Sequence, residues 1–451
     1  MSQQQLQLLS KITIGGQELS NRVVLAPLTR GRYVTFCLLN EGWMDGWIAD
    51  AREVNERLCV VRLCIYTLTY SPTHSLARSL YKRRCYRGTP TDDPFDPKSR
   101  IPNEDQALYY EQRASGGLLI TEATAFNEEG YGWIYAPQLQ TPDQVDGWRK
   151  VTDRVHAKGG KIYVQLWHMG RQAHSSFHPT TNRIVSASNL PMTGGAEAKT
   201  IHRENVQPEI PVSMSIEDIQ STIRDFVKGA HNARAAGFDG IELHAANGYL
   251  LDQFLQSVSN IRTDVYGGSK ENRLRFLREV IEAIIESGAY PANRIGFRIS
   301  PNGSFGGMGS SDNFEMFTYV AQELNKYGLA YIHVMDGTGF GYHGKDKIVT
   351  LSDIRKVWDS AIIANVGLTK EIAEGLIRSG AADLAAFGRL YMSNPDLPER
   401  FANDWPLEEV APYETWWQPI GSKGYTDWKP YTPPKNAKKD GDHEVQEEKK
   451  E

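Results

Sequence analysis

The chain has 451 residues, a formal net charge of −5 and four cysteines. It contains neither a long basic run nor an apolar stretch long enough to span a bilayer, so we expect neither nucleic acid nor a membrane as its partner. The N-terminal residues lack the basic and apolar regions of a signal peptide, which favours a cytoplasmic enzyme.

Short β-rich runs that end in small or polar residues alternate with helical patterns along the chain. The runs predict strands at 22–27, 118–123, 161–167, 240–245, 295–300, 330–335, 361–366 and 383–388. Capping residues, apolar stripes and stop signals predict helices at 141–158, 215–236, 270–287 and 313–327.

About eight evenly spread strands predict one α/β domain, a (β/α)₈ TIM barrel over residues 1–430. The alternative is an open doubly wound sheet, which is disfavoured because no G-x-G-x-x-G follows the first strand. The Ser-, Thr-, Asn- and Pro-rich segment 174–211 is typical of a functional loop. Residues 431–451, rich in Pro, Lys, Glu and Asp, predict a disordered tail.

Residues 33–87 fit neither the strand nor the helix pattern and interrupt the first βα loop. All four cysteines fall here, and the rest of the chain has none. The codons of the two ends can contain an intron donor and an acceptor in the same reading phase. We interpret this atypical insertion as a translated, unspliced intron, and the alternative is a genuine lineage-specific insertion.

The sequence HAANGY follows the fourth predicted strand, at the barrel mouth where such folds place their active sites. His244 and Asn247, three residues apart on a tight turn, can both direct donors at one carbonyl oxygen and stabilise charge that develops there. Tyr249 offers a phenolic proton nearby and is the candidate general acid.

The sequence over 244–257, HAANGYLLDQFLQS, and NIRTDVYGGS at 260–269 resemble the Old Yellow Enzyme family of FMN-dependent ene-reductases. Further matches occur in order, at 21–30, 108–115, 118–124, 165–171, 295–301 and 387–400. His168 and Arg171 in QLWHMGR make the oxophytodienoate reductases the most similar subgroup. Only the insertion and the tail lie outside the resemblance.

The resemblance implies a set of residues that bind FMN: Pro27, Leu28, Thr29, Ala123, Gln165, Arg298, Gly367, Gly388 and Arg389. A cation at Arg298 would stabilise the anionic N1 edge of reduced flavin. The glycines and Arg389 follow the last two strands, whose loops commonly cradle phosphate in such barrels. Trp416 and Trp417 stand where the family more often has Phe-Tyr, and Trp417 is the candidate substrate contact.

The implied function is hydride transfer from NADPH through FMN to the activated C=C bond of α,β-unsaturated carbonyl compounds. We expect a small-molecule enone as the partner, no metal, and a monomer or homodimer. The alternative function is a regulatory or inactive barrel that cannot hold FMN because of the insertion. An iron–sulfur flavoenzyme is disfavoured because no cysteine lies beyond Cys85, and a glycosidase because paired carboxylates at strand ends are not evident.

Overall fold

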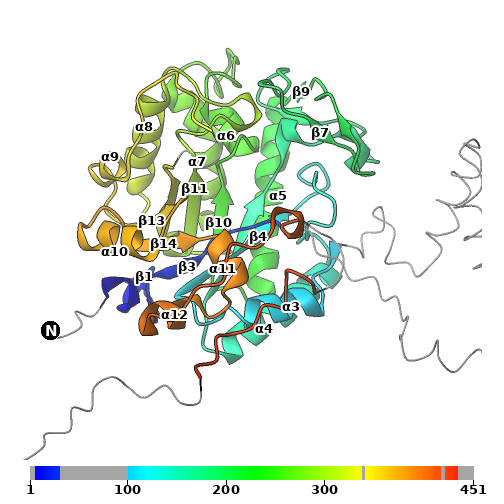
Figure 1. Ribbon diagram of the computed structural model, residues 1–451. Helices are drawn as coiled ribbons and strands as arrows, with labels where there is room; N and C mark the ends of the chain where they lie inside the picture. Colours follow the sequence, from blue (N-terminus) through cyan, green and yellow to red (C-terminus); the bar gives the residue numbers. More distant parts are fainter. Residues whose placement is uncertain (1–5, 31–99, 338–340, 418–421, 435–451) are drawn as a thin grey trace, which may run out of the picture.

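The computed structural model describes residues 6–30, 100–337, 341–417 and 422–434. Eight parallel strands close into a barrel in the order β10-β11-β12-β13-β14-β3-β4-β5, and helices surround them (Figure 1). This closed barrel confirms the predicted TIM fold and excludes the open sheet. The predicted insertion at 33–87 and the tail from residue 435 onward lie outside the described residues.

Every predicted strand is present in the barrel, and the boundaries differ by at most two residues. The barrel strands are β3 (Val23–Leu25), β4 (Leu118–Ala125), β5 (Ile162–Trp167), β10 (Gly240–His244), β11 (Ile295–Ile299), β12 (Tyr331–Met335), β13 (Ala361–Asn365) and β14 (Leu384–Phe387). Most of their residues are buried on both faces, as expected for a parallel sheet covered by helices.

The four predicted helices are present, and their bounds differ from the predicted ones by at most two residues. The helices that the structure describes are α3 (Glu104–Glu111), α4 (Pro142–Ala157), α5 (Ile216–Ala235), α6 (Leu250–Leu255), α7 (Lys270–Glu286), α8 (Asn313–Asn325), α9 (Leu351–Arg355), α10 (Lys370–Arg378), α11 (Arg389–Ser393) and α12 (Leu397–Asn403). Thr141 and Gln144 form a reciprocal capping box on α4, and Ser215 and Asp218 form another on α5. These caps explain why both predicted helix starts are correct.

Short strands and 3₁₀ turns lie at both ends of the barrel. An N-terminal hairpin pairs β1 (Ile12–Ile14) with β2 (Gln17–Leu19), while β6 (Val185–Ser186) pairs with β9 (Val212–Ser213) and β7 (Ala198–Lys199) with β8 (Asn205–Val206). The 3₁₀ turns are η1 (Gln7–Leu9), η4 (Gly170–Gln172), η5 (Ser175–Phe177), η6 (Ala292–Arg294), η7 (Phe305–Gly307) and η8 (Tyr413–Thr415). The segment 174–211 therefore contains strands too short to leave a periodic pattern in the sequence.

The barrel interior is layered because side chains alternate along each strand. Tyr163 of β5 and Tyr331 of β12 fill one layer, with ring centroids 5.9 Å apart. A Cβ atom added at Gly240 or Gly296 would come within 2.3 Å of these rings, so both glycines make room for them. Two residues further along the same strands, the interior becomes polar, and this polar layer lies directly beneath the mouth.

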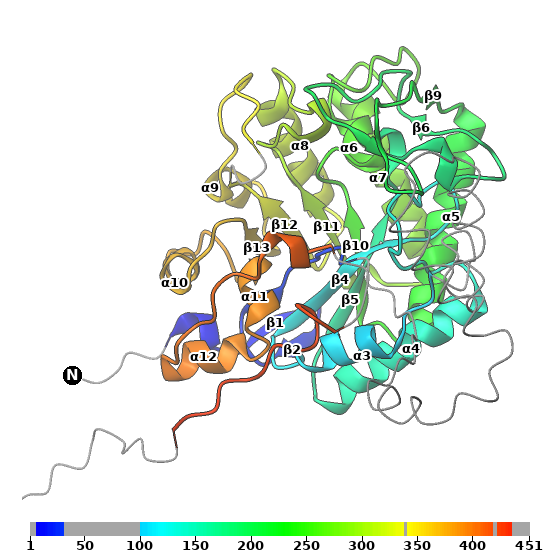
Figure 2. The same ribbon diagram turned by 45° about the vertical axis from the view of Figure 1, so that its right-hand side comes forward.

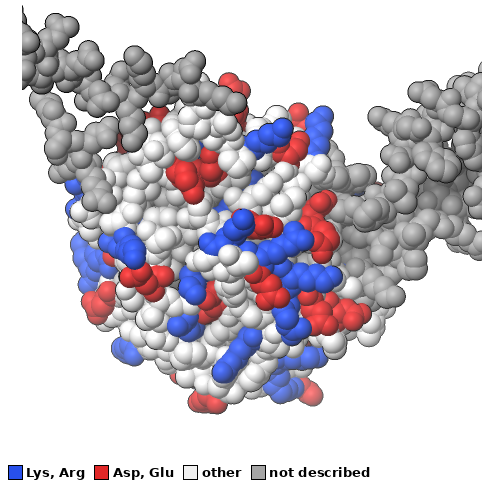
Figure 3. Space-filling view, turned by 90° about the horizontal axis from the view of Figure 1, so that it is seen from below, with Lys and Arg blue, Asp and Glu red and all other residues white. Residues whose placement is uncertain are grey.

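The two ends of the sequence meet because β14 pairs with β3. Figures 1 and 2 show the N-terminal hairpin beside α10 to α12, and the Glu374 carboxylate of α10 accepts N–H groups from Gln7 and Leu8. On the face in Figure 3, basic and acidic side chains are intermingled among uncharged ones. That face therefore presents no extended patch of one sign among its described residues.

Candidate active site

The turn after β10 is held in a tight, left-handed conformation by three neighbouring elements. Asn247 has φ 57° and Gly248 has φ 72°. The Asn247 N–H donates to Ser300 Oγ at 2.7 Å, and its C=O accepts from Gln172 Nε2 at 2.6 Å. The Gly248 N–H donates to Asp252 Oδ2 at 2.8 Å. A non-glycine residue in this region is strained, and such strain is typical of functional sites.

His244 ends β10 and is buried at the mouth, with 4% of its surface exposed. Its Nδ1 atom is buried and has no hydrogen-bond partner among the described residues. Burial, and then the nearby Arg298 and His333, hold the pKa of His244 well below its usual range. The ring is therefore neutral near pH 7 and has an uncommitted nitrogen for a ligand.

Tyr249 lies edge-on between two aromatic rings. Its ring centroid is 4.8 Å from that of His244 and 5.4 Å from that of Trp167. Burial raises the pKa of Tyr249 to about 12, although Arg298 opposes that shift. The phenol therefore keeps its proton at neutral pH, as a proton donor must.

Arg298 lies on β11 directly beside His244, because the two residues are register partners. One guanidinium nitrogen donates to Asn365 Oδ1 at 2.7 Å, and Nε is buried without a partner among the described residues. Burial lowers the pKa of Arg298, and Glu242 opposes this shift. Arginine remains protonated in such surroundings, so a buried cation lies below the mouth.

Ala123 and Gln165 are register partners on β4 and β5, and both are buried. The strand register shifts between Ile120 and Ala123, and such an irregularity changes the direction in which the following side chains of β4 point. Gln165 Nε2 donates to Glu242 Oε1 at 2.7 Å, so the amide is anchored within the polar layer. The structure thus brings two predicted FMN contacts together on adjacent strands.

The predicted flavin contacts Pro27, Leu28 and Thr29 directly follow β3. Pro27 is buried, whereas Leu28 and Thr29 are half-buried. A Cβ atom added at Gly388 would lie 3.3 Å from Leu28 Cδ2, which places this segment against the loop after β14. The first and last barrel strands therefore bring the predicted ring contacts next to the predicted phosphate loop.

The two predicted phosphate-binding loops are neighbours because β13 pairs with β14. Val366 and Gly367 both have positive φ, at 86° and 72°, and no atom of the described residues lies within 4 Å of a Cβ atom added at Gly367. Arg389 is exposed, and its guanidinium carbon lies 5.5 Å from the centroid of the Trp416 ring. The loops therefore combine open space, strained backbone and an accessible cation, as a phosphate cradle requires.

Trp417 is 41% exposed, and its ring packs against other aromatic rings. Its ring centroid lies 5.5 Å from that of Trp416 and 6.4 Å from that of Trp133. Arg30, which is buried, anchors this segment by donating to the carbonyl oxygens of Trp416 and Gly424 at 2.9 and 2.8 Å. Sequence reasoning missed Trp133 and Arg30, because neither belongs to a motif with chemistry of its own.

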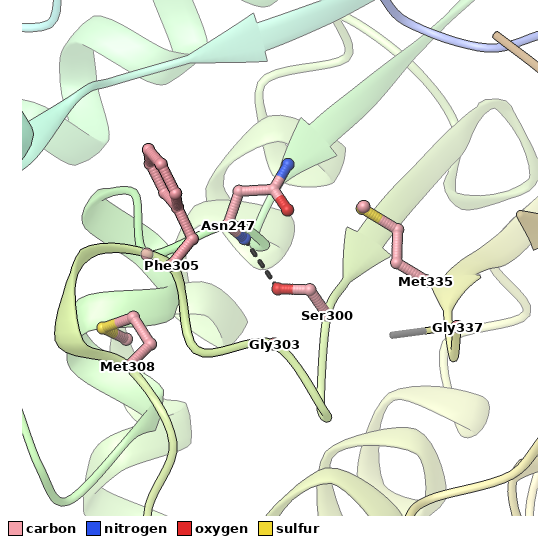
Figure 4. A pocket seen from close by; sticks show the side chains of 8 residues that line it. Asn247, Ser300, Gly303, Phe305, Met308, Met335 and Gly337 are labelled. Carbon is pink, nitrogen blue, oxygen red and sulfur yellow. Dashed lines mark hydrogen bonds between the residues drawn. The ribbon is translucent and has the colours of Figure 1, made fainter. Parts of the chain in front are cut away.

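A small pocket lies beside the strained turn (Figure 4). Its lining residues are Asn247, Gly248, Ser300, Gly303, Phe305, Met308, Met335 and Gly337. Ser300 holds the backbone of Asn247, whose carboxamide extends away from Ser300 (Figure 4). The glycine-rich loop at 302–308 lies beside this turn at the mouth of the barrel.

A protein-family model described as the NADH:flavin oxidoreductase / NADH oxidase family matches residues 76–408. The chain belongs to this family. The matched range begins inside the stretch 33–87, so β3 and the segment 27–29 precede it. The barrel closure described above places that first strand with the rest of the family domain.

Curated relatives and solved structures agree with this membership. The chain is 36% identical to 12-oxophytodienoate reductase 2 of Arabidopsis thaliana over 337 residues, covering 73% of this chain and 87% of that protein. It is 39% identical to a probable flavin mononucleotide-dependent alkene reductase of Leishmania infantum over 337 residues, covering 73% and 89%. Morphinone reductase gives a TM-score of 0.75 at 30% identity, covering 96% and 98%. An old yellow enzyme homologue from Zymomonas mobilis gives 0.74 at 32%, covering 94% and 99%.

These findings confirm the Old Yellow Enzyme resemblance and the expectation of an FMN-dependent oxidoreductase that passes hydride from a nicotinamide to activated alkenes. They do not favour the alternative of a barrel unable to hold FMN.

The described residues also fit the cofactor of this family. Among the described residues, the buried Arg298 Nε has no partner and the space at Gly367 is open, and these observations test the fit. Arg298, Gln165 and Ala123 would hold the ring system, and the loops at Gly367 and Gly388 would hold the phosphate.

Two further findings concern other kinds of site. Within the described ranges, no group of three or more His, Cys, Asp or Glu side chains is arranged to hold a metal ion. None of the helices that the structure describes is both long and apolar enough to cross a membrane.

Proposed function

We propose that this member of the family uses NADPH to reduce α,β-unsaturated aldehydes and ketones, with substrate held at the mouth by His244 and Asn247. The observation that carries the proposal is the buried Nδ1 of His244, which no described residue satisfies, at the end of β10 and three residues from Asn247 on the strained turn. A buried polar atom without a partner is costly, so a bound carbonyl group would satisfy it. We further propose that the protein is cytoplasmic and that it is a monomer or a homodimer.

The protonation state of each side chain determines its role in the proposed reaction. Neutral His244 and the Asn247 amide donate to the carbonyl oxygen and stabilise the charge that develops on it. Tyr249, whose pKa is raised to about 12, gives its proton to the α-carbon. The transfer of hydride from nicotinamide to the β-carbon is the chemistry that bound FMN supplies. Trp417, exposed beside Trp133, would contact the substrate from the C-terminal segment.

The decisive experiment compares His244→Ala and Asn247→Ala with the wild type. Both variants should retain FMN but bind phenols and enones more weakly, and each should lose roughly 10²-fold or more in enone turnover. His231→Ala removes an exposed histidine on α5 and serves as the control. Normal enone turnover in both site variants would contradict the proposal.

The choice of electron donor needs a separate measurement, since the preference for NADPH rests on the resemblance alone. The kcat/KM values for flavin reduction by NADPH and by NADH should differ in favour of NADPH. Equal values, or a higher value for NADH, would contradict this part of the proposal and leave the enone site unaffected.

A further inference from the structure

A fully buried carboxylate lies beneath the mouth and belongs to none of the roles assigned above. Glu242 is 0% exposed and precedes His244 by two residues on β10, so both side chains face the barrel interior. One carboxylate oxygen accepts from Gln165 Nε2 at 2.7 Å, and the other lies 2.9 Å from His333 Nδ1. A buried charge persists only when it is paired and hydrogen-bonded, and these contacts meet that requirement.

The charge states follow from the same contacts. Burial alone would raise the pKa of Glu242, but His333, Arg298 and Gln165 together hold it below its usual range. Burial lowers the pKa of His333 despite the neighbouring carboxylate. Glu242 is therefore ionised and His333 neutral at pH 7, which assigns the His333 Nδ1 proton to the hydrogen bond.

The contact with Glu242 fixes the orientation of the Gln165 amide. An ionised carboxylate only accepts hydrogen bonds, so the NH₂ group of Gln165 must face it, and the amide cannot flip without losing that bond. The Gln165 Oε1 atom is consequently left free to face a ligand. Without this anchor, the amide oxygen and nitrogen could exchange places at little cost.

Glu242 also offsets the buried cation. Arg298 lies on the neighbouring strand β11 as the register partner of His244, two residues beyond Glu242, so the two opposite charges are close, while its side-chain hydrogen bond goes to Asn365 on β13. In a low-dielectric interior, one nearby negative charge cancels much of the field that one positive charge produces. A ligand beside Arg298 thus experiences the difference between the two charges rather than the full cation.

We propose that Glu242, braced by His333, is a positioning residue that orients the Gln165 amide and lowers the reduction potential of bound FMN by offsetting the charge of Arg298. The inference rests on the proposed placement of FMN against Gln165 and Arg298. A purely structural ion pair would affect stability and leave the reduction potential unchanged, so the potential is the measurement that discriminates.

The main test is the midpoint potential of the FMN-bound variant Glu242→Gln, measured by dye equilibration. The glutamine can still accept from Gln165 and can face His333, but it removes one negative charge. Reduced, anionic FMN should then bind about tenfold more tightly relative to oxidised FMN, which corresponds to a rise of about 30 mV for a two-electron couple.

Glu242→Asp separates orientation from charge and also serves if Glu242→Gln fails to fold. It keeps the negative charge but is too short to reach Gln165 in its present position. The apoprotein should bind FMN roughly tenfold more weakly, as expected for about one lost hydrogen bond, while the potential changes little. Wild-type affinity in this variant would overturn the orienting role.

Two control variants test the role of Glu242 separately from the proposed position of FMN. Glu374→Gln alters a buried carboxylate on α10 that serves η1, and it should lower stability without moving the potential. Arg298→Gln should lower the potential. If Arg298→Gln moves the potential and Glu242→Gln does not, the role of Glu242 is wrong and the placement stands. If neither moves it, the placement fails and the inference fails with it.

Discussion

The rings of His244 and Tyr249 meet edge to face, with centroids 4.8 Å apart and planes inclined by 77°. The two side chains come from the end of β10 and the residue before α6, and the strained turn at Asn247 and Gly248 brings them together. The residue proposed to donate to the carbonyl oxygen and the residue proposed to protonate the α-carbon are therefore in direct contact. The proposed function has two half-reactions, the reduction of the flavin by nicotinamide and the reduction of the alkene. Only the second needs a proton from Tyr249, so the two can be separated experimentally.

Tyr249→Phe should slow only the half-reaction with the alkene. A proton donor is required when the α-carbon is protonated and is not required when nicotinamide reduces the flavin. Phenylalanine preserves the edge-to-face packing on His244 and Trp167, so the fold should be unaffected. Stopped-flow traces of the two half-reactions measure this, and equal slowing of both would refute the role of Tyr249.

Ser300→Ala should loosen the turn that carries Asn247. The Asn247 N–H would lose its acceptor at 2.7 Å, and leaving a buried donor unpaired costs roughly 1–3 kcal/mol of unfolding free energy. The kcat/KM for enones should also fall, because the backbone of the turn determines the position of the Asn247 side chain. Ser221→Ala, at an exposed position on α5, is the control for denaturation and kinetics. Wild-type enone kinetics in Ser300→Ala would show that the turn does not depend on this bond.

Gly388→Ala should weaken FMN binding about tenfold or more without unfolding the barrel. The added Cβ would lie 3.3 Å from Leu28 Cδ2, a flexible side-chain end that can move slightly, but it would also occupy the proposed phosphate cradle. Gly375→Ala adds a methyl group on α10 where nothing lies within 4 Å, and its FMN affinity should equal that of the wild type. Fluorescence titration of the apoprotein with FMN measures both, and equal affinities would exclude Gly388 from the cradle.

The sequence predicted those parts of the molecule that depend on local pattern. The barrel strands are recognisable as short apolar runs, and the starts of α4 and α5 follow from their capping residues. His244, Asn247 and Tyr249 share one turn, so their proximity followed from their spacing alone. The structure brings Ala123 together with Gln165 because they lie on paired strands, and it brings Gly367 near Gly388 because the strands that precede these two glycines are paired.

Other features depend on contacts between strands that no single segment reveals. Glu242 meets Gln165 and His333 only because the closed barrel brings three strands together: Gln165 is its register partner on β5, and His333 reaches it from β12, two strands away. The anchoring of the Trp416 segment by Arg30 joins residues 386 positions apart. The strained φ of Val366 likewise arises from the packed loop, since a β-branched residue has no local preference for that region.

Acid should destabilise the protein partly through His168. This side chain is 2% exposed, its Nδ1 accepts from the Gly170 N–H, and burial lowers its pKa to about 3. The unfolded chain has a histidine pKa of about 6.5, so the unfolded state binds more protons between those two values. Stability is therefore fully present above about pH 6.5 and is lost as the pH falls, by on the order of 1 kcal/mol per unit.

His168→Asn should remove this dependence while keeping an acceptor near Gly170. Urea denaturation at pH 7, 6 and 5 should give a smaller loss of unfolding free energy for the variant than for the wild type. The exposed His231→Asn variant should follow the wild-type slope. Identical slopes for His168→Asn and the wild type would show that His168 does not titrate as its burial requires.

Deleting residues 33–87 should raise soluble yield, melting temperature and FMN occupancy together. The motivation is that the family pattern continues across the cut, from LAPLTRGR to GTPTDDPFDP, and the deleted stretch contains all four cysteines. Both flanking residues have partners in the described part of the chain, since Arg30 donates to the C-terminal segment and Arg100 to Gln138. Residues 31–32 and 88–99 would then connect these two residues, and the cost of loop closure depends only weakly on length.

The three readouts should change together because apolar residues and thiols promote aggregation and cross-linking when they are exposed. FMN that binds the folded state further adds stability by mass action. The ratio of flavin to protein absorbance, thermal melting and yield of the two chains measure the effect directly. If the deletion instead lowers flavin content or the melting temperature, the stretch is an evolved part of the enzyme. The interpretation as a translated intron is then wrong, whatever its codon junctions allow.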